Sequence, residues 1–246
     1  MAEDLSKALE SAAKLAAQKG LVRFTRFLDP AQAVQAQEIA REQGTQLDCW
    51  GGYDGAERVI ACFYPPGMKP ARDEYPLCCL NSRFSAKFCS LSHRDLLGSF
   101  MALGLTRACI GDIIIDGENV FLFATEQTAG FIAESMTSAG RAALRFEVLT
   151  AIPPMPAPKG TRFSAVVSSL RLDAVLAAAY RLSRADAADM IRAGFVKLDH
   201  LPCERVDAAV NEGSLLSLRA KGRVRLVSQD GLTRKQRIGI TFFRYE

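Results

Sequence analysis

Six cationic side chains near the C-terminus have the types and spacing that suit binding of an anion. Arg171 and Arg184 stand at the starts of two predicted helices, where backbone N–H groups already favour negative charge. Lys197 follows on a predicted strand, and Arg219, Lys221 and Arg223 surround a glycine in a short loop. Cations gathered from separate elements of one small domain favour a phosphate backbone, with affinity from counterion release. The alternative is a solvated basic surface.

Two short helices and a small sheet must position these cations. Apolar residues at helical spacing predict the first helix: Leu172, Val175, Leu176 and Ala179. Ser183 predicts the start of the second helix, with Asp186 in the capping-box position, and Gly194 its end. Alternating apolar runs predict strands over 195–198, 214–218 and 224–227.

The positive charge of the chain is concentrated in this region. The 246 residues carry a net charge of only +4. From Leu170 onward there are 14 Lys and Arg against 9 Asp and Glu, whereas the rest of the chain has 17 against 18. The C-terminal third is therefore the part suited to nucleic acid.

Three segments of this region, in order, resemble the RNA-binding fold of the ribosomal protein S-four type: RLDAVL, LSRADAADMIRAGFVKLD and GSLLSLRAKGR. That fold is two helices packed on a small bent sheet, and it binds structured RNA. The resemblance implies RNA contacts from eight residues: Arg171, Asp173, Ser183, Arg184, Lys197, Arg219, Lys221 and Arg223. Asp173 either accepts a hydrogen bond from RNA or holds Arg171 in place. Simple stabilisation of the first helical turn is the alternative for this residue.

The whole chain resembles the YlmH family. The segments that carry this resemblance are FLDPAQ from Phe27, GGYDGAERVIACFYP from Gly51, HRDLLGSFMALGLTRACIGDIII from His93, and the final RKQRIGITFFRYE. It implies a non-enzymatic RNA-binding protein that associates with the large ribosomal subunit, through ribosomal RNA and peptidyl-tRNA, in quality control of stalled translation. A role in ribosome assembly or cell division is the alternative within the same class.

The predicted fold class is α+β, with four segments. Residues 1–82 form an N-terminal α+β region, with helices over 1–19 and 30–42 and strands over 59–64 and 75–80. Residues 83–151 follow the β-α-β-β-α-β order of ferredoxin-like domains, starting with a strand at 84–89. Four prolines mark a linker within 152–168, and the S-four-like domain spans 169–246 with a last strand at 238–243.

Weaker candidates lie outside the eight residues. The family resemblance implies a second RNA-binding region in the middle of the chain, where Arg94, Arg107 and Arg141 are the cations to test. Trp50 is either a base-stacking platform or, as we expect, a packed anchor of its loop. Arg234, Lys235 and Arg237 add three cations after the predicted loop of the S-four-like domain.

The sequence favours a binding module over an enzyme. It lacks a G-x-G-x-x-G, a P-loop, an H-E-x-x-H and a nucleophile elbow. We expect His93 to cap or hydrogen-bond a helix start and Asp112 to be structural. An RNA pseudouridine synthase is the enzymatic alternative, because many carry an S-four-type module; there, however, the module usually comes first. A tyrosyl-tRNA synthetase also carries a C-terminal module of this kind, but its nucleotide-binding signature is missing here.

Composition sets the remaining expectations. Seven cysteines, without a C-x-x-C pair or a secretory leader, predict reduced thiols and a cytoplasmic location. Two histidines without ligand spacing to cysteines predict no metal, and we expect no cofactor. No apolar run approaches the roughly 20 residues of a membrane helix, so we expect no membrane partner. We expect a monomer that binds RNA.

Overall fold

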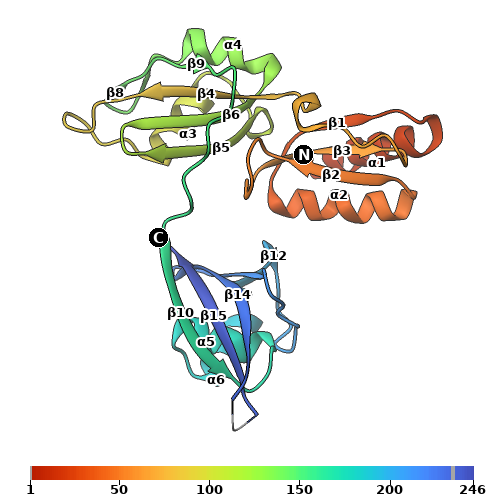
Figure 1. Ribbon diagram of the computed structural model, residues 1–246, viewed down its shortest axis with the longest axis vertical. Coiled ribbons are helices and arrows are strands. Elements are labelled where there is room, and N and C mark those ends of the chain that lie inside the picture. The colour runs from red at the N-terminus through yellow and green to blue at the C-terminus, as the bar shows by residue number, and fades with distance from the viewer. Residues whose placement is uncertain (1, 234–235) are drawn as a thin grey trace. The chain divides into compact units, whose positions relative to one another are not determined.

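The computed structural model describes residues 2–233 and 236–246 and divides the chain into two compact units, Met1–Pro156 and Ala157–Glu246. Figure 1 shows the elements of each unit. The division falls inside the proline-rich segment. That segment was predicted to extend to residue 168, but residues 160–167 form a strand that belongs to the C-terminal unit.

The first unit begins with two helices on a small sheet. α1 (Ala2–Lys19) and α2 (Pro30–Gln43) are the helices predicted over 1–19 and 30–42. Three strands, β1 (Arg23–Leu28), β2 (Gln46–Trp50) and β3 (Val59–Tyr64), pair antiparallel in the order β1-β3-β2. The pattern analysis did not predict β1 or β2. Each is half-buried and short, so its apolar alternation is weak.

β3 places alternate side chains in two different cores. Ala61 and Phe63 pack with α1 and α2, whereas Ile60 and Cys62 pack with residues of the following domain, such as Phe123. This period of two follows from the pleat of a strand. The small N-terminal sheet is therefore buried on both faces within this unit.

The middle of the first unit has the predicted ferredoxin-like order. Its main strands and helices are β4 (Leu77–Arg83), α3 (His93–Ala102), β5 (Ile110–Asp116), β6 (Asn119–Thr125), α4 (Glu126–Ser135) and β9 (Glu147–Val148). Short pieces complete it: the 3-10 turns η1 (Arg72–Glu74) and η2 (Arg107–Cys109), and the two-residue strands β7 (Ser138–Ala139) and β8 (Ala142–Ala143). The sheet is antiparallel in the order β5-β6-β4-β9, which places the first and third strands at its centre.

The first strand of this sheet differs from the prediction. We expected residues 84–89, but β4 ends at Arg83 and residues 85–88 form a turn. β4 is instead the strand that was predicted over 75–80 and assigned to the preceding region. The alternation at Phe84 to Cys89 therefore does not reflect a strand, and the boundary predicted between residues 82 and 83 cuts through β4.

The second unit is two helices on one six-stranded antiparallel sheet. Its helices are α5 (Leu172–Tyr180) and α6 (Arg184–Arg192). The strands are β10 (Gly160–Val167), β11 (Val196–Leu198), β12 (Leu201–Pro202), β13 (Leu215–Leu218), β14 (Gly222–Leu232) and β15 (Ile238–Tyr245). They pair in the order β10-β15-β14-β13-β11-β12. The predicted helices and strands are thus present, and two strands that were not predicted, β10 and β12, lie at the two edges of the sheet.

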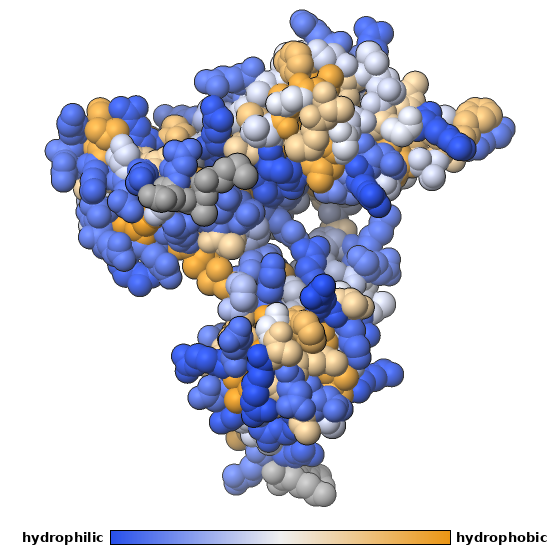
Figure 2. All heavy atoms as spheres, turned by 180° about the vertical axis from the view of Figure 1, so that it is seen from behind, coloured by the Kyte–Doolittle hydropathy of each residue, from blue (hydrophilic) through white to orange (hydrophobic). Residues whose placement is uncertain are grey.

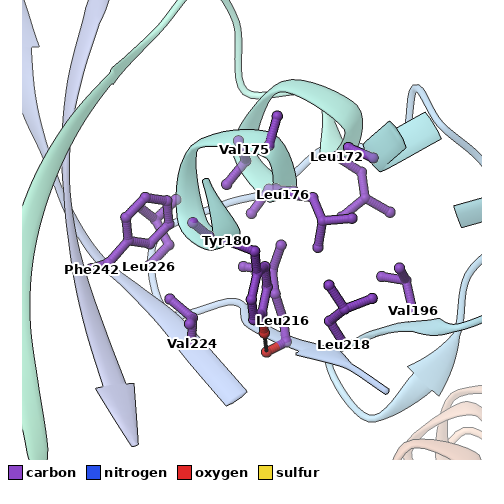
Figure 3. Packing of buried hydrophobic residues seen from close by; sticks show 14 of the residues in the cluster. Leu172, Val175, Leu176, Tyr180, Val196, Leu216, Leu218, Val224, Leu226 and Phe242 are labelled. Carbon is purple, nitrogen blue, oxygen red and sulfur yellow. Dashed lines mark hydrogen bonds between the residues drawn. The ribbon is translucent and has the colours of Figure 1, made fainter. Parts of the chain in front are cut away.

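A single apolar core joins the helices to one face of this sheet. Figure 3 shows Leu172, Val175 and Leu176 of α5 facing Leu216, Val224 and Phe242 of the strands. Tyr180 closes the core, because its hydroxyl donates to the carbonyl oxygens of Leu216 at 3.1 Å and Gly222 at 2.9 Å. Burial raises the pKa of this phenol to about 12. The other face of the sheet, carrying the alternate residues, is not covered by α5 or α6.

Candidate nucleic-acid interface

The two predicted helix starts are where the sequence placed them. Arg171 is the N-cap residue of α5, and Ser183 is the N-cap of α6, with Arg184 as its first helical residue. The Ser183 hydroxyl accepts a hydrogen bond from the backbone N–H of Asp186 at 3.0 Å. That hydroxyl already serves the helix, so Ser183 contributes to the site by fixing the backbone that carries Arg184.

Asp173 joins the two helix starts. One carboxylate oxygen accepts from Nη2 of Arg184 at 2.7 Å, and the other accepts from Nε of Arg171 at 3.3 Å and from the backbone N–H of Ala174 at 2.9 Å. Asp173 is 8% exposed, and it is one of few charged or polar residues buried among those described. We call Arg171, Asp173 and Arg184 the Arg–Asp–Arg cluster. Of the roles foreseen for Asp173, the structure shows two: it holds Arg171, and its bond to the Ala174 N–H stabilises the first turn of α5. The structure adds Arg184 as a further partner.

Opposing effects set the charge state of Asp173. Burial raises the pKa of its carboxyl, but the hydrogen bonds from Arg184 and Arg171 lower it, and the pKa ends below its ordinary value. The carboxylate is therefore ionised at neutral pH. Three charges in contact leave a net charge of +1 in the cluster.

The two arginines of the cluster remain open to solvent. Their side chains are 46% and 54% exposed, while that of Asp173 is 11% exposed. Each guanidinium has five N–H donors in a planar fork, so a contact to one carboxylate oxygen leaves donors for a phosphate. Asp173 thus fixes the orientation of two arginines at neighbouring helix starts, and such preorganisation lowers the entropy cost of binding a ligand.

Lys197 and Arg223 lie apart from the Arg–Asp–Arg cluster, on strands of the C-terminal sheet. Lys197 of β11 pairs with Ser217 of β13, and Ser217 pairs with Arg223 of β14. Directly paired residues share a face. Their neighbours Val196, Leu218 and Val224 are buried under the helices, so Lys197 and Arg223 are on the uncovered face. The structure therefore divides the predicted residues between the helix starts and the opposite face of the sheet.

Arg219 and Lys221 are in the turn between β13 and β14. Ala220 and Gly222 have φ of +64° and +81°, and the backbone N–H of Lys221 donates to the carbonyl of Leu218 at 2.9 Å. Both cationic side chains are exposed. The Arg219 guanidinium lies 5.7 Å from the ring centroid of Phe195, which is 43% exposed. Arg219 and Phe195 therefore place a cation and an exposed aromatic ring side by side at the turn between β13 and β14.

Sequence reasoning missed residues beside Arg223. Arg225 is two residues further along β14, on the same face, and its Nε donates to the Tyr245 hydroxyl at 2.8 Å. Arg223 lies 5.2 Å from the Tyr245 ring centroid. The alternation Arg-Val-Arg was a visible signal for the two arginines. The neighbouring tyrosine depends on the pairing of β14 with β15, which the pattern of either strand alone does not give.

The glycine-rich segment 51–58 is a structural clasp in the first unit. Asp112 of β5 accepts from the backbone N–H groups of Glu57 at 2.7 Å and Arg58 at 3.0 Å, and from the hydroxyl of Tyr53 at 2.9 Å. The Arg58 guanidinium donates to the carbonyls of Ile110 and Arg107, each at 2.8 Å. These bonds connect the loop before β3 with β5. They give Asp112 the structural role that we expected.

The candidates of the first unit are spread out. Arg94 is exposed on α3, and Arg141 is exposed in the turn between β7 and β8, whereas Arg107 is half-buried beside Arg58. His93 is the first residue of α3, which Ser92 caps. The Arg72 guanidinium lies over the Trp50 ring, 4.4 Å from the ring centroid. Trp50 also packs against a buried core, which fits the packed anchor that we expected. Arg234 and Lys235 lie outside the described residues.

Within residues 2–233 and 236–246, no three His, Cys, Asp or Glu side chains are grouped so as to hold a metal ion. Over the same residues, the helices are too short or too polar for one to cross a bilayer. The seven cysteines are free thiols.

Known proteins resemble this chain in sequence and in fold. Residues 70–151 match a family described as "Putative RNA-binding domain in YlmH". Over 224 residues, which are 91% of this chain and 87% of the relative, the sequence is 36% identical to the Ribosome-associated protein quality control protein P2 of Bacillus subtilis (strain 168). The solved cell division protein ylmH from Streptococcus pneumoniae shares the fold, with a TM-score of 0.51 and 22% identity over 60% of this chain and 90% of that chain.

Proposed function

This chain belongs to the YlmH family, and on that premise we propose that it is a cytoplasmic, non-enzymatic RNA-binding protein that associates with the large ribosomal subunit. In this proposal it contacts ribosomal RNA and a peptidyl-tRNA left after stalled translation. It holds the tRNA during quality control of the stalled chain. The name of the Bacillus subtilis relative and the description of the matched RNA-binding domain support this assignment.

The observation that carries the proposal is the Arg–Asp–Arg cluster. Two arginines from different helix starts are fixed by one buried carboxylate and still expose half of their side chains. Helix N-termini favour phosphate, and guanidinium forks match its geometry. Each guanidinium has five N–H donors, more than its contact with Asp173 uses.

Binding follows from electrostatics and positioning. Arg171 and Arg184 contact phosphates of a folded RNA, and the cationic turn at Arg219 and Lys221 adds a further attraction. Each phosphate neutralised releases counterions, so affinity falls as salt rises. No bond is made or broken in this role. The protein acts by occupying a site on RNA and keeping it in place.

Co-sedimentation tests the assignment. Purified protein is mixed with separated ribosomal subunits and run on sucrose gradients at 50 mM and 200 mM salt. We expect it with the large subunit at low salt and largely released at high salt. Protein that stays at the top of the low-salt gradient contradicts the ribosome assignment. In parallel, conversion of uridine in transcribed ribosomal RNA by the protein alone would contradict the non-enzymatic one.

A further inference from the structure

The uncovered face of the C-terminal sheet carries two neighbouring rows of cationic and aromatic residues. The first row runs Lys197, Ser217, Arg223, then Tyr245, which contacts Arg223 and pairs with Gly160. The second row runs Leu215, Arg225, Phe243, Arg162. These eight residues include four cations and two aromatic rings. A carboxylate, that of Asp199, lies at the Leu215 end of the second row, where it accepts from the backbone N–H of Leu215 at 2.7 Å and from the Ser214 hydroxyl at 3.0 Å.

The aromatic side chains of this face are held in fixed positions. The Tyr245 and Phe243 rings meet edge to face, with centroids 5.0 Å apart. Arg225 donates from Nε to the Tyr245 hydroxyl at 2.8 Å and from Nη1 to the carbonyl of Gly213 at 2.9 Å. A Cβ on Gly160 would lie 2.6 Å from the Phe243 ring, so this ring lies directly over the backbone of β10. Glycine at position 160 makes room for it.

The planar groups of Arg223 and Tyr245 on this face are of the kind on which nucleobases stack. The Arg223 guanidinium lies 5.2 Å from the centroid of the Tyr245 ring. Unpaired bases stack on aromatic rings and on guanidinium planes, while cations beside them hold the phosphates. Lys197 and Arg162, both exposed, are at the two ends of the rows. Arginine and aromatic residues are also enriched in protein interfaces, but four cations on one face favour a polyanion such as RNA.

The third row of the face has a different character. Ser228, Thr241 and Ser164 are paired across β14, β15 and β10, and Asp230 accepts from the hydroxyls of Ser228 and Thr241, each at 2.7 Å. This carboxylate limits the anion-binding area to the two rows described above. Figure 2, viewed from behind, shows hydrophilic residues between small hydrophobic groups on the C-terminal unit.

We propose that this sheet face is a second RNA contact, separate from the Arg–Asp–Arg cluster, and that it binds a single-stranded segment. Bases stack on Tyr245 and Arg223, and phosphates contact Lys197 and Arg162. The inference rests on the proposed RNA-binding function. It deepens that function by assigning the class of RNA: unpaired nucleotides on the sheet, folded RNA at the helix starts.

The test separates bases from phosphates. Fluorescence anisotropy of the full chain is measured with a labelled uridine 12-mer and with an abasic ribose-phosphate 12-mer. We expect the wild type to bind the uridine 12-mer about tenfold more tightly, the gain typical of one stacked base. Tyr245→Leu keeps apolar volume and removes the ring, so this preference is lost while binding of the abasic 12-mer stays. Phe88→Leu, at an 81% exposed ring in the other unit, is the matched control and leaves the preference intact.

A second variant guards against a folding defect. Arg162 is exposed on the edge strand β10, so Arg162→Glu is expected to preserve the fold, as checked by circular dichroism. It weakens binding of both 12-mers. An unchanged preference in folded Tyr245→Leu, unchanged binding in folded Arg162→Glu, or no preference in the wild type overturns the inference. If the inference fails but the wild type still co-sediments with large subunits, the proposed function survives. If the wild type binds neither the RNA 12-mers nor the large subunits, the inference and the proposed function both fail.

Discussion

Asp173 bonds two arginines that are 13 residues apart in the sequence. Its replacement tests how much this carboxylate contributes to the free energy of unfolding. Asp173→Asn removes the charge from three hydrogen bonds and leaves two guanidinium groups side by side. We expect a loss of about 1–3 kcal/mol in the free energy of unfolding at pH 7. Asp189→Asn is the control. That exposed residue forms an ion pair with Arg192 within α6, and we expect a change below about 0.5 kcal/mol.

The same variant has a defined pH dependence. The folded-state pKa of Asp173 is lowered, so its contribution is complete above the unfolded value of 3.8 and disappears as pH falls through the folded value. Urea unfolding of the wild type and Asp173→Asn should therefore differ at pH 7 and converge below pH 3.8. A stability gap that stays constant down to the acid limit would show that the charge of Asp173 is not what stabilises the fold.

Asp112 tests the clasp in the first unit. Asp112→Ala leaves the backbone N–H groups of Glu57 and Arg58 and the hydroxyl of Tyr53 without their acceptor. We expect a loss of about 2–4 kcal/mol in the transition of that unit, because each lost hydrogen bond to a charged group counts for roughly 1.5–3 kcal/mol and water recovers part. Asp116→Ala, at the end of the same strand, is the control. Equal stability of the two variants would contradict the stabilising role of the Asp112 hydrogen bonds.

At the scale of elements, glycines mark where strands approach side chains. A Cβ on Gly111 of β5 would lie 2.6 Å from the Phe27 ring and 2.9 Å from Cβ of Phe123. We expect Gly111→Ala to destabilise the first unit by about 1–3 kcal/mol through overpacking. Gly98 of α3 has open space around it, and Gly98→Ala should stabilise the helix by up to about 1 kcal/mol. Thermal unfolding of the two variants should shift in opposite directions.

Elements with strong local signals could be predicted from the sequence. Ser183 located the start of α6, and apolar residues at helical spacing located α5. β10 was missed because it follows the prolines directly and its partner β15 is about 80 residues away in the chain. The candidate site shows the same contrast between local and long-range signals. Helix starts are encoded locally, so Arg171 and Arg184 could be placed from the sequence. The row of Lys197, Arg223 and Tyr245 depends on strand register, which the sequence of each strand alone does not give.

At the scale of the whole molecule, the two units should fold independently. Each has its own apolar core, and the division falls at residues 156 and 157. We expect a fragment of residues 157–246 to unfold cooperatively in urea. A fragment of residues 169–246 lacks β10, which uncovers the edge of β15 and removes Phe163 from its contact with Phe242. We expect it to aggregate or remain unfolded. Equal behaviour of both fragments contradicts this assignment of β10.

The salt dependence of RNA binding tests the central claim most directly. A variant with Arg171→Gln, Asp173→Asn and Arg184→Gln removes the cluster without leaving a buried charge unpaired. Dissociation constants for a structured ribosomal RNA fragment are measured between 50 mM and 300 mM salt, with Lys14→Gln on α1 as control. We predict that the triple variant loses at least about tenfold in affinity at 100 mM salt and roughly 1–2 in the slope of log affinity against log salt. Unchanged affinity and slope in the folded triple variant would contradict the account.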